Sequence, residues 1–553
     1  MRNLSIFLGF LLGALVLTYP LVRHPLSHIP LGAEPAGTVP LFNLWTLQWN
    51  IDQLRQGYPH YWDAPIFAPN TGTFAFSEIQ PVTALLAAPL WLVAQAPALG
   101  YNAVVILFLT LNGWFSYALL RGWGASPLVA FWTGLLMQAL PGVAQEMGVL
   151  QLLTLFGFLW TLFFLDRWLR RPTWSNVVAL AVGPPVTFLT CGYYGLLSLI
   201  FLPLALPFLL LNHSAPRTEN DRPRRWLGLL AAVGLAAGLT GPLVVAQQQQ
   251  LDRYGFSRSD RTIENNSARL VDYAKPLDYN LFYGHLLGLT SEPGQRLFPG
   301  LVLISLGLTG LGGKPRRAIK VYLLVAIIVA FFLSLGLRLE VGAFQPYAWL
   351  RAVLPGFEQL RSPFRFAYFA QLHLALLAGF GLMNLEAWLN RSSRFSARAL
   401  AGKLLPAGVA LLAVSEALAL PLPLLPLPDL ETGAAWQAWI NRQPGTPTLV
   451  MLPFAASPRA ADFEQTVIWM LVNRDLDARM VNGYSGFFPR EHARLREAMT
   501  RFPSEEGLNL LRQSGVDLVI IYHSLSNIPA TGPDRLVPVY ADPRQNVSIY
   551  RLQ

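Results

Sequence analysis

Four acidic side chains fall in the hydrophilic stretch 23–99, which follows the first apolar run of the chain. Glu34 comes about a dozen residues after that run and therefore stays near the membrane surface. Asp52, Asp63 and Glu78 follow it. A carboxylate close to hydrocarbon is costly, so its presence suggests a cavity and a task. Simpler readings are a helix cap for Glu78, a turn for Asp63 and an exposed helix face for Asp52.

Three arginines in other hydrophilic segments could bind an anion. Arg269 lies in Asn-Ser-Ala-Arg-Leu-Val-Asp-Tyr, while Arg361 and Arg365 flank a Ser-Pro-Phe segment just before an apolar run. A guanidinium binds phosphate in a bidentate way and stays charged at any working pH. These side chains could hold a lipid-linked phosphate. They could equally contact lipid headgroups, or pair with Asp272 or Glu358.

Polar and aromatic residues also follow two apolar runs further along the chain. Glu146 lies in Gln-Glu-Met-Gly, and Tyr193 and Tyr194 lie in Cys-Gly-Tyr-Tyr-Gly. Such residues could form the wall of an outward-facing cavity. For the tyrosines the alternative is the aromatic belt that membrane proteins place at the lipid–water interface.

The elements that carry these residues are membrane spans. Of 553 residues 53% are apolar and only 13% charged, whereas a soluble protein carries about a quarter charged residues. Apolar runs long enough to cross a bilayer recur through residues 1–425. The composition thus predicts a polytopic α-helical membrane protein of about eleven spans. The predicted spans are about 4–22, 101–120, 126–141, 150–166, 175–190, 194–211, 226–246, 299–313, 319–337, 366–388 and 404–425.

The positive charges orient these spans. Cytoplasmic loops carry an excess of Lys and Arg. The basic clusters are Arg121, Arg167–Arg171, Arg217–Arg225, Lys314–Lys320 and Arg391–Lys403. With these loops inside, the N-terminus is cytoplasmic, and segments 23–99, 247–298, 338–365 and the tail lie outside. The first run has no cleavage pattern behind it and is predicted to be a retained helix. The run 81–96 is predicted to be re-entrant or interfacial; in the alternative, it crosses the membrane and the N-terminus lies outside.

Residues 426–553 have the composition of a soluble domain, so we place the domain boundary near 425. The pattern predicts an extracytoplasmic α/β domain. Its predicted elements are strands at 448–452 and 517–522, helices at 461–473, 491–501 and 505–514, and a hairpin around 536–552. In the first outer loop, an amphipathic helix from about Pro40 to Gln56 is predicted to lie on the membrane interface.

Several kinds of chemistry are not supported by the sequence. It contains no Gly-rich phosphate loop, no His-Glu-x-x-His pair and no Gly-x-Ser-x-Gly turn. Cys191 is the one cysteine, so neither an intrachain disulfide nor a cysteine metal cluster can form. The net charge of +10 lies in the short loops. Anionic lipid, not nucleic acid, is the partner that this distribution predicts.

Five stretches together resemble the GT-C superfamily of membrane glycosyltransferases, in particular a bacterial group within it. They are Val39-Pro-Leu-Phe-Asn-Leu-Trp-Thr, Tyr61-Trp-Asp-Ala-Pro-Ile-Phe, Phe74-Ala-Phe-Ser-Glu-Ile-Gln-Pro, Leu360-Arg-Ser-Pro-Phe-Arg-Phe and Val481-Asn-Gly-Tyr-Ser-Gly-Phe-Phe-Pro. The resemblance spans nearly the whole chain. It implies a bacterial inner-membrane enzyme that moves a sugar from a polyprenyl-phosphate donor to a glycan, lipid or protein acceptor on the outer face.

The resemblance also implies roles for the acids of the first outer loop. By position, the base that takes the proton of the acceptor hydroxyl falls on Glu34, with Glu78 or Asp63 as second choices. The first outer loop lacks the adjacent paired acids found in the superfamily, and nothing in the sequence requires a divalent metal. The terminal domain would act on the acceptor side or as a lid, with Tyr484 facing the membrane domain.

Two other functions compete with glycosyl transfer. A lipid-glycan transporter or flippase would need polar residues that run through the spans, and Glu386 and Glu416 are the exceptions to their apolar character. A non-catalytic envelope assembly protein would use its outer domain to bind a glycan or a protein partner.

Overall fold

The computed structural model describes residues 2–213, 221–284, 294–342, 344–391, 396–430, 434–525 and 535–553. Contacts between Cα atoms divide the chain into two compact units. Unit 1 comprises Met1–Ala33, Pro89–Pro242 and Ser257–Leu424, and unit 2 comprises Glu34–Ala88, Leu243–Phe256 and Leu425–Gln553. Two helices, α3 (Pro81–Ala94) and α10 (Asp221–Asp252), begin in one unit and end in the other.

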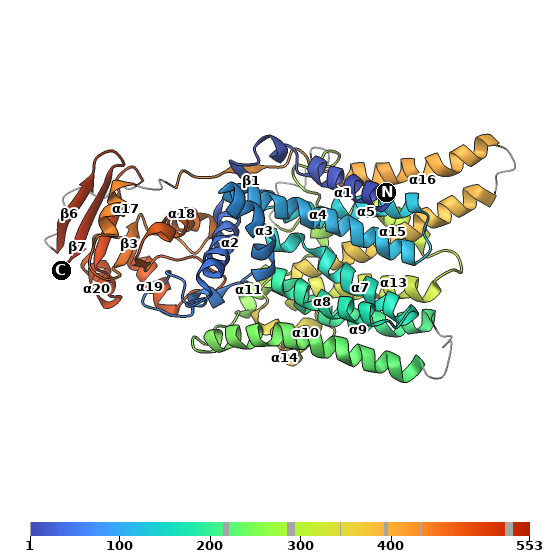
Figure 1. The fold of residues 1–553 in the computed structure, drawn as a ribbon, viewed down its shortest axis with the longest axis horizontal. Helices are drawn as coiled ribbons and strands as arrows, with labels where there is room; N and C mark the ends of the chain where they lie inside the picture. The colour runs from blue at the N-terminus through green and yellow to red at the C-terminus, as the bar shows by residue number, and fades with distance from the viewer. Residues whose placement is uncertain are drawn as a thin grey trace. The chain divides into compact units, whose positions relative to one another are not determined.

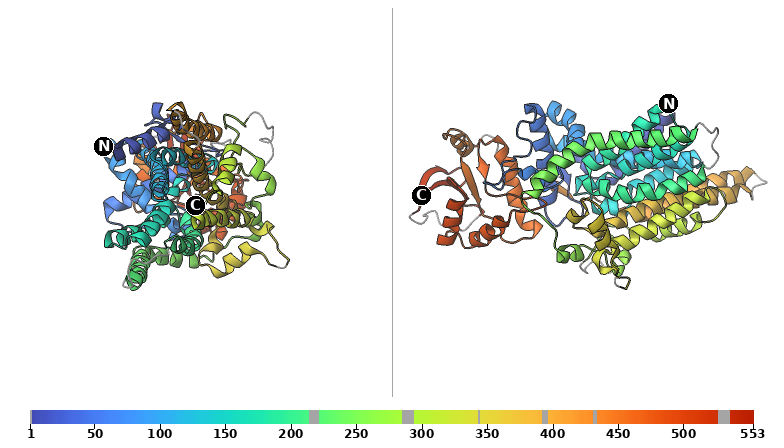
Figure 2. Two further views of the ribbon diagram at one scale, coloured as in Figure 1. Left: turned by 90° about the vertical axis from the view of Figure 1, so that its right-hand side faces the viewer. Right: turned by 90° about the horizontal axis from the view of Figure 1, so that it is seen from below.

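Unit 1 is a bundle of helices that run side by side (Figures 1 and 2). Each of the eleven predicted spans overlaps one helix. Besides α10, these are α1 (Arg2–Leu17), α4 (Pro97–Gly122), α5 (Pro127–Gln138), α7 (Leu155–Arg170), α8 (Trp174–Thr190), α9 (Gly192–Asn212), α12 (Leu301–Gly310), α13 (Arg317–Ser334), α15 (Phe366–Arg391) and α16 (Ser396–Ala417). Shorter elements are β1 (His28–Pro30), α6 (Pro141–Gln145), α11 (Asp260–Asn265) and α14 (Pro346–Val353).

Length and composition separate the helices of the bundle into two groups. Among the described residues, seven helices are long and apolar enough to cross a membrane, the η3–α7 stretch Leu150–Arg170 and α10 among them. The helices α1, α3, α8, α12 and α16 contribute apolar segments of 10–17 residues. The predicted run 81–96 is helix α3, whose 14 residues are fewer than the roughly 20 that a straight span requires.

Polar side chains inside the bundle fasten one helix to another. Gln138 donates from Nε2 to the carbonyl oxygens of Phe10 and Leu109, at 2.9 and 3.0 Å, and so ties α5 to α1 and α4. Asn112 accepts from the backbone N–H of Phe156 at 2.7 Å near the start of α7. Such bonds satisfy backbone groups that hydrocarbon would leave unpaired.

Glu416 serves as a cap, although its position in a span invited a transport role. Its carboxylate accepts from the backbone N–H groups of Leu301 and Val302, at 2.6 and 2.8 Å, at the start of α12. The Tyr283 hydroxyl donates to the same carboxylate at 2.5 Å. A carboxylate at a helix N-terminus satisfies orphan N–H groups and complements the helix dipole. Helix structure therefore explains this buried acid.

Unit 2 contains a mixed sheet covered by helices. The strands are β3 (Thr448–Leu452), β4 (Arg479–Met480), β5 (Leu518–Tyr522), β6 (Leu536–Asp542) and β7 (Val547–Leu552), while β2 (Leu424–Pro426) lies at the unit boundary. The order is β4-β3-β5-β7-β6, with β3 parallel to β4 and β5, and β7 antiparallel to β5 and β6. The helices are α2 (Thr38–Gln56), α17 (Ala435–Ile440), α18 (Glu464–Val472), α19 (Arg490–Met499) and α20 (Glu505–Gln513).

Backbone hydrogen bonds join the first outer loop to the terminal domain within unit 2. The N–H of Ala68 donates to the carbonyl of Met480 at 2.9 Å, and the N–H of Gly37 donates to the Glu464 carboxylate at 2.9 Å. The end of α10 joins them, since Gln247 donates to the carbonyl of Ser77 at 2.9 Å. The three segments thus form one compact unit.

Helix α2 occupies the range of the predicted interfacial helix but not its predicted environment. Its aromatic side chains Phe42 and Trp45 are buried, as are most residues of the helix. The helix packs against α18 of the same unit. The prediction that its apolar face lies on the membrane interface was wrong, because the terminal domain covers that face. The contact with α18 could not be predicted, because α18 lies far from α2 in the sequence.

His492 of α19 makes the stability of unit 2 depend on pH. Its ring is buried among Phe67 and Phe488, and burial lowers its pKa to about 3. The unfolded chain takes up the proton near pH 6.5 and the folded chain does not, so stability is lost as pH falls from about 6.5 towards 3. We expect a loss of about 1.4 kcal/mol per pH unit in that window. Thermal unfolding of the purified protein at a series of pH values measures this.

The variant His492→Phe should flatten that dependence, because it removes the group that titrates. His60→Gln, which changes an exposed histidine of the same unit, should keep the wild-type slope. An equal slope in wild type and His492→Phe would contradict the assignment.

Candidate functional site

A buried carboxylate lies directly after helix α6 in unit 1. Glu146 is 4% exposed. The Tyr368 hydroxyl, on α15, donates to its Oε1 at 2.5 Å. The Nε of Arg365 lies 3.9 Å from the same oxygen. A buried carboxylate is stable only when it is paired and hydrogen-bonded, and Glu146 has both kinds of partner. It thereby fixes the position of Arg365.

The guanidinium of Arg365 is also held by an aromatic ring. Its central carbon lies 4.9 Å from the ring centroid of Tyr193, a cation–π distance. The Tyr193 hydroxyl accepts from the backbone N–H of Ser362 at 2.7 Å, which ties α9 to the segment ahead of α15. The structure thus brings together Glu146, Tyr193 and Arg365, three residues that the sequence placed in separate segments.

Arg258 and Arg361 belong to the same group as Arg365. The half-buried Arg258 donates from Nε to the carbonyl of Gln359 at 3.3 Å, and Arg351 donates to the carbonyl of Arg258 at 2.7 Å. Burial lowers the pKa of Arg258 to about 9, and the positive charge of the exposed Arg361 lowers it further. Two neighbouring guanidinium groups repel each other, so an anion bound beside them would be stabilised.

Sequence reasoning named Arg361 and Arg365 but missed Arg258. The available signal was its place within Phe-Ser-Arg-Ser-Asp-Arg, in the segment 247–298 that is predicted to lie outside, since a positive charge there runs against the cytoplasmic bias. We call Arg258, Arg361 and Arg365, with Tyr193 and Glu146, the arginine cluster.

Tyr194 and Arg269, two other predicted site residues of unit 1, contact residues that are not part of the arginine cluster. Tyr194 is buried, and its hydroxyl donates to the carbonyl of Leu152 at 2.8 Å, so it packs inside the bundle. Arg269 pairs with the buried Asp272 at 3.0 Å, and Lys275 lies 3.6 Å from the same carboxylate oxygen. The structure therefore shows the alternative in which Arg269 pairs with Asp272.

The acids predicted as candidate bases all lie in unit 2. Glu34 is its first residue and is half-buried, shortly before α2. Glu78 is half-buried and lies three positions before Pro81, the first residue of α3. Asp63 is exposed, and its Oδ1 accepts from the backbone N–H of Gly72 at 2.8 Å. The turn proposed for Asp63 is thus present.

Tyr484 is 8% exposed and packs within unit 2. Its ring lies 5.3 Å from that of Phe42, 5.4 Å from that of Phe463 and 6.0 Å from that of Phe488. Phe42 belongs to the first predicted outer loop, so the ring contacts a segment outside the terminal domain, and its facing the membrane domain stays a prediction.

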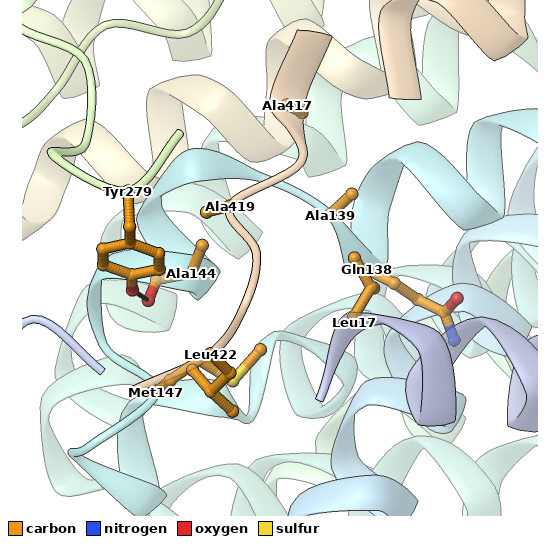
Figure 3. A pocket seen from close by; sticks show the side chains of 9 residues that line it. All are labelled: Leu17, Gln138, Ala139, Ala144, Met147, Tyr279, Ala417, Ala419 and Leu422. Carbon is orange, nitrogen blue, oxygen red and sulfur yellow. Dashed lines mark hydrogen bonds between the residues drawn. The ribbon is translucent and has the colours of Figure 1, made fainter. Parts of the chain in front are cut away.

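Two further features could complete a site near the arginine cluster, a metal-binding group and a cavity. Within the described ranges, no group of three or more His, Cys, Asp or Glu side chains is arranged to hold a metal ion. A cavity beside Glu146, between Met147 and Tyr279, has a volume of about 10 Å³ (Figure 3). In Figure 3 the Tyr279 hydroxyl donates to the carbonyl of Ala144, at 2.7 Å. This space holds no more than one water molecule.

No family model matches the chain, and no curated protein matches it either. Solved structures do. The oligosaccharyltransferase of Archaeoglobus fulgidus in its apo form is 14% identical, with a TM-score of 0.55, covering 94% of this chain and 69% of that one. The arabinofuranosyltransferase AftD from Mycobacteria is 13% identical, with a TM-score of 0.57, covering 100% of this chain and 40% of that one. Both belong to the GT-C type. The chain has a GT-C fold.

The GT-C fold accounts for the architecture of both units. Folds of this type are polytopic helical membrane proteins, so the helices of unit 1 are confirmed as a membrane domain. A third GT-C structure, archaeal AglB from Archaeoglobus fulgidus with an inhibitory peptide and a dolichol-phosphate, is 13% identical with a TM-score of 0.51, covering 94% of this chain and 69% of that one. At these identities the likeness is one of fold, and this chain spans less than half the length of AftD.

Proposed function

We propose that this GT-C protein transfers a sugar from a polyprenyl-phosphate donor to an acceptor on the outer face of the membrane. The arginine cluster carries the proposal. Arg258, Arg361 and Arg365 lie in one cluster with Tyr193, and the charges of Arg258 and Arg361 repel each other, so a bound anion would stabilise the cluster. A neighbour in fold, AglB, has been solved with a dolichol-phosphate. A lipid-linked phosphate is the anion that suits both observations.

The arginines have two tasks in this reaction. They bind the phosphate of the donor through charge-assisted hydrogen bonds. As the bond between the anomeric carbon and the phosphate oxygen breaks, they stabilise the negative charge that develops on the departing phosphate. Glu146 and Tyr193 hold Arg365 in place and so act as positioning residues.

Glu34 is proposed as the general base, on the resemblance of the first outer loop to the GT-C superfamily. Its carboxylate takes the proton of the acceptor hydroxyl while the hydroxyl oxygen attacks the anomeric carbon. Glu78 and Asp63 are the second choices. The lipid phosphate leaves with the bonding electron pair. No nucleotide takes part, since the lipid–phosphate bond supplies the driving force.

The proposal includes a location. Unit 2 would lie on the outer side of a bacterial inner membrane, with the N-terminus in the cytoplasm, as the basic loops of unit 1 predict. Its partners would be a lipid-linked sugar, membrane lipids and a glycan, lipid or protein acceptor.

Binding and transfer by the full-length protein in lipid nanodiscs test the proposal. Polyprenyl monophosphate, the probe, should bind, and its affinity should fall as salt rises. Polyprenyl-phosphate pentoses and hexoses should then be offered with lipid, glycan and peptide acceptors, and transfer followed by mass spectrometry. Binding without transfer to any acceptor class would favour an assembly role. Absence of binding would overturn the proposal.

Of the two acidic residues that favoured a transporter, Glu386 and Glu416, the second has a structural role. Glu416 caps α12, which leaves Glu386, a half-buried residue in the second half of α15. Movement of a labelled lipid-linked sugar across proteoliposomes, without transfer, would restore this alternative.

A further inference from the structure

Unit 2 contains a second cavity that the proposed reaction does not use. It encloses about 470 Å³ and is open to solvent, within the range of roughly 300–1,000 Å³ typical of small-molecule sites. Its wall is formed by the segment after α2 and by the end of α10. The residues that line it include Tyr58, Trp62, Asp63, Gln250 and Arg253.

The aromatic wall of this cavity is held rigidly. Tyr58 adopts a left-handed backbone conformation, with φ of 62°, and its N–H donates to the carbonyl of Gln53 at 2.9 Å. The Trp49 indole donates to the carbonyl of Tyr61 at 2.9 Å, and the Tyr61 hydroxyl donates to Asn50 at 2.9 Å. A non-glycine residue in this conformation costs free energy and is found preferentially at functional sites. Here it directs an aromatic ring, 44% exposed, towards solvent.

The polar wall is held by a separate set of bonds. The backbone N–H of Gly72 donates to Asp63, and the Tyr254 hydroxyl donates to the carbonyl of Thr71 at 2.7 Å. These bonds fasten loop 71–72 both to the aromatic segment and to the end of α10. Gly72 also has a positive φ, of 67°, and a Cβ there would lie 2.5 Å from the Gln250 side chain. Glycine is therefore required for this close approach.

The side chains around the cavity suit a particular class of ligand. A sugar ring presents an apolar face of C–H groups and an edge of hydroxyls, and aromatic rings cover the first while planar polar groups bond the second. Tyr58 and Trp62 supply rings, and Asp63, Gln250 and Arg253 supply a carboxylate, an amide and a guanidinium. The carboxylate offsets the guanidinium, so a neutral polyol fits better than a phosphate.

We propose that this cavity binds a neutral saccharide, as the subsite for the glycan of the acceptor. The biological role of the saccharide rests on the proposed transfer reaction, but its binding does not. Asp63 then recognises a sugar hydroxyl through the carboxylate oxygen that does not accept from Gly72. It is a binding residue in this assignment and not the base.

Saccharide binding by the full-length protein in phosphatidylcholine nanodiscs tests the assignment. Saturation-transfer NMR with a panel of neutral di- and trisaccharides, built from pentoses and hexoses, should identify at least one ligand. Trp62→Ala and Arg253→Gln should each weaken its binding by about tenfold, the loss of roughly 1.4 kcal/mol. Tyr540→Ala, a half-buried aromatic residue of β6 that does not line the cavity, is the matched control and should bind as wild type.

Two results would overturn the assignment: no panel member binds the wild type, or the ligand binds Trp62→Ala and Arg253→Gln as tightly as wild type. Arg253 is exposed at a helix end, so its variant folds even if Trp62→Ala does not. The double variant Arg258→Gln/Arg361→Gln separates the two proposals. It should keep saccharide binding while it loses lipid phosphate, so failure of transfer alone leaves the cavity assignment standing.

Discussion

Replacing Arg258 and Arg361 together by glutamine should lower sugar transfer by roughly two to three orders of magnitude, because the charge on the departing phosphate loses its stabilising partners. Each lost charge-assisted hydrogen bond removes about 1.5–3 kcal/mol, so affinity for polyprenyl monophosphate should fall at least tenfold. Binding measured in nanodiscs and initial rates of transfer give the two numbers. These residues are better targets than Arg365, whose loss would leave the buried Glu146 without its ion pair.

Arg338→Gln is the matched control for this prediction. Arg338 is exposed, lies in the same predicted outer segment as Arg361, and donates to the carbonyl of Glu264 at 3.2 Å. It should bind the lipid phosphate and transfer sugar at the wild-type rate. A double variant at Arg258 and Arg361 that retains wild-type affinity would remove the cluster from the donor site.

Glu34→Gln should reduce transfer by roughly two to four orders of magnitude, the range that a general base contributes. The amide keeps the shape and polarity of the side chain but cannot accept the proton of the acceptor hydroxyl. Donor binding should stay at the wild-type level, because the phosphate is held by arginines of unit 1. The substitution should therefore lower the rate of sugar transfer within the bound complex, which single-turnover experiments measure directly.

Glu491→Gln provides the comparison, since Glu491 is an exposed acid of the same unit. It should leave the rate unchanged. Unaltered transfer by Glu34→Gln would exclude Glu34 as the base. A loss found instead in Glu78→Gln or Asp63→Asn would move the role to that residue, and for Asp63 it would argue against its part in saccharide binding.

The membrane helices were predictable because each is encoded in a contiguous run of apolar residues. Each of the eleven runs overlaps a helix, and seven of these helices are, among the described residues, long and apolar enough to cross a membrane, where backbone groups must be satisfied within the segment. The strands β3 and β5 of unit 2 were predictable for a related reason, because a strand buried on both faces needs a continuous apolar stretch such as 518–522.

The contacts between distant segments were not predictable. Nothing in the sequence of α2 shows that α18, some four hundred residues later, covers its apolar face. A buried helix and an interfacial helix share the same pattern of Leu, Phe and Trp. Arg258 was missed for a similar reason. Its neighbour Arg361 lies about a hundred residues away in the sequence, and their mutual repulsion exists only in the folded chain.

The discontinuity of unit 2 has a consequence for how cells make this protein. Residues 34–88 leave the ribosome early, but their partners in 425–553 follow only after the whole intervening stretch 89–424 has been synthesised and inserted. At about 5–20 residues per second, that delay lasts tens of seconds. Throughout it the aromatic face of α2 lacks its cover, so nascent chains at this stage are natural clients for membrane-associated chaperones. Release of a prematurely terminated chain would leave the same surface open to aggregation and proteolysis.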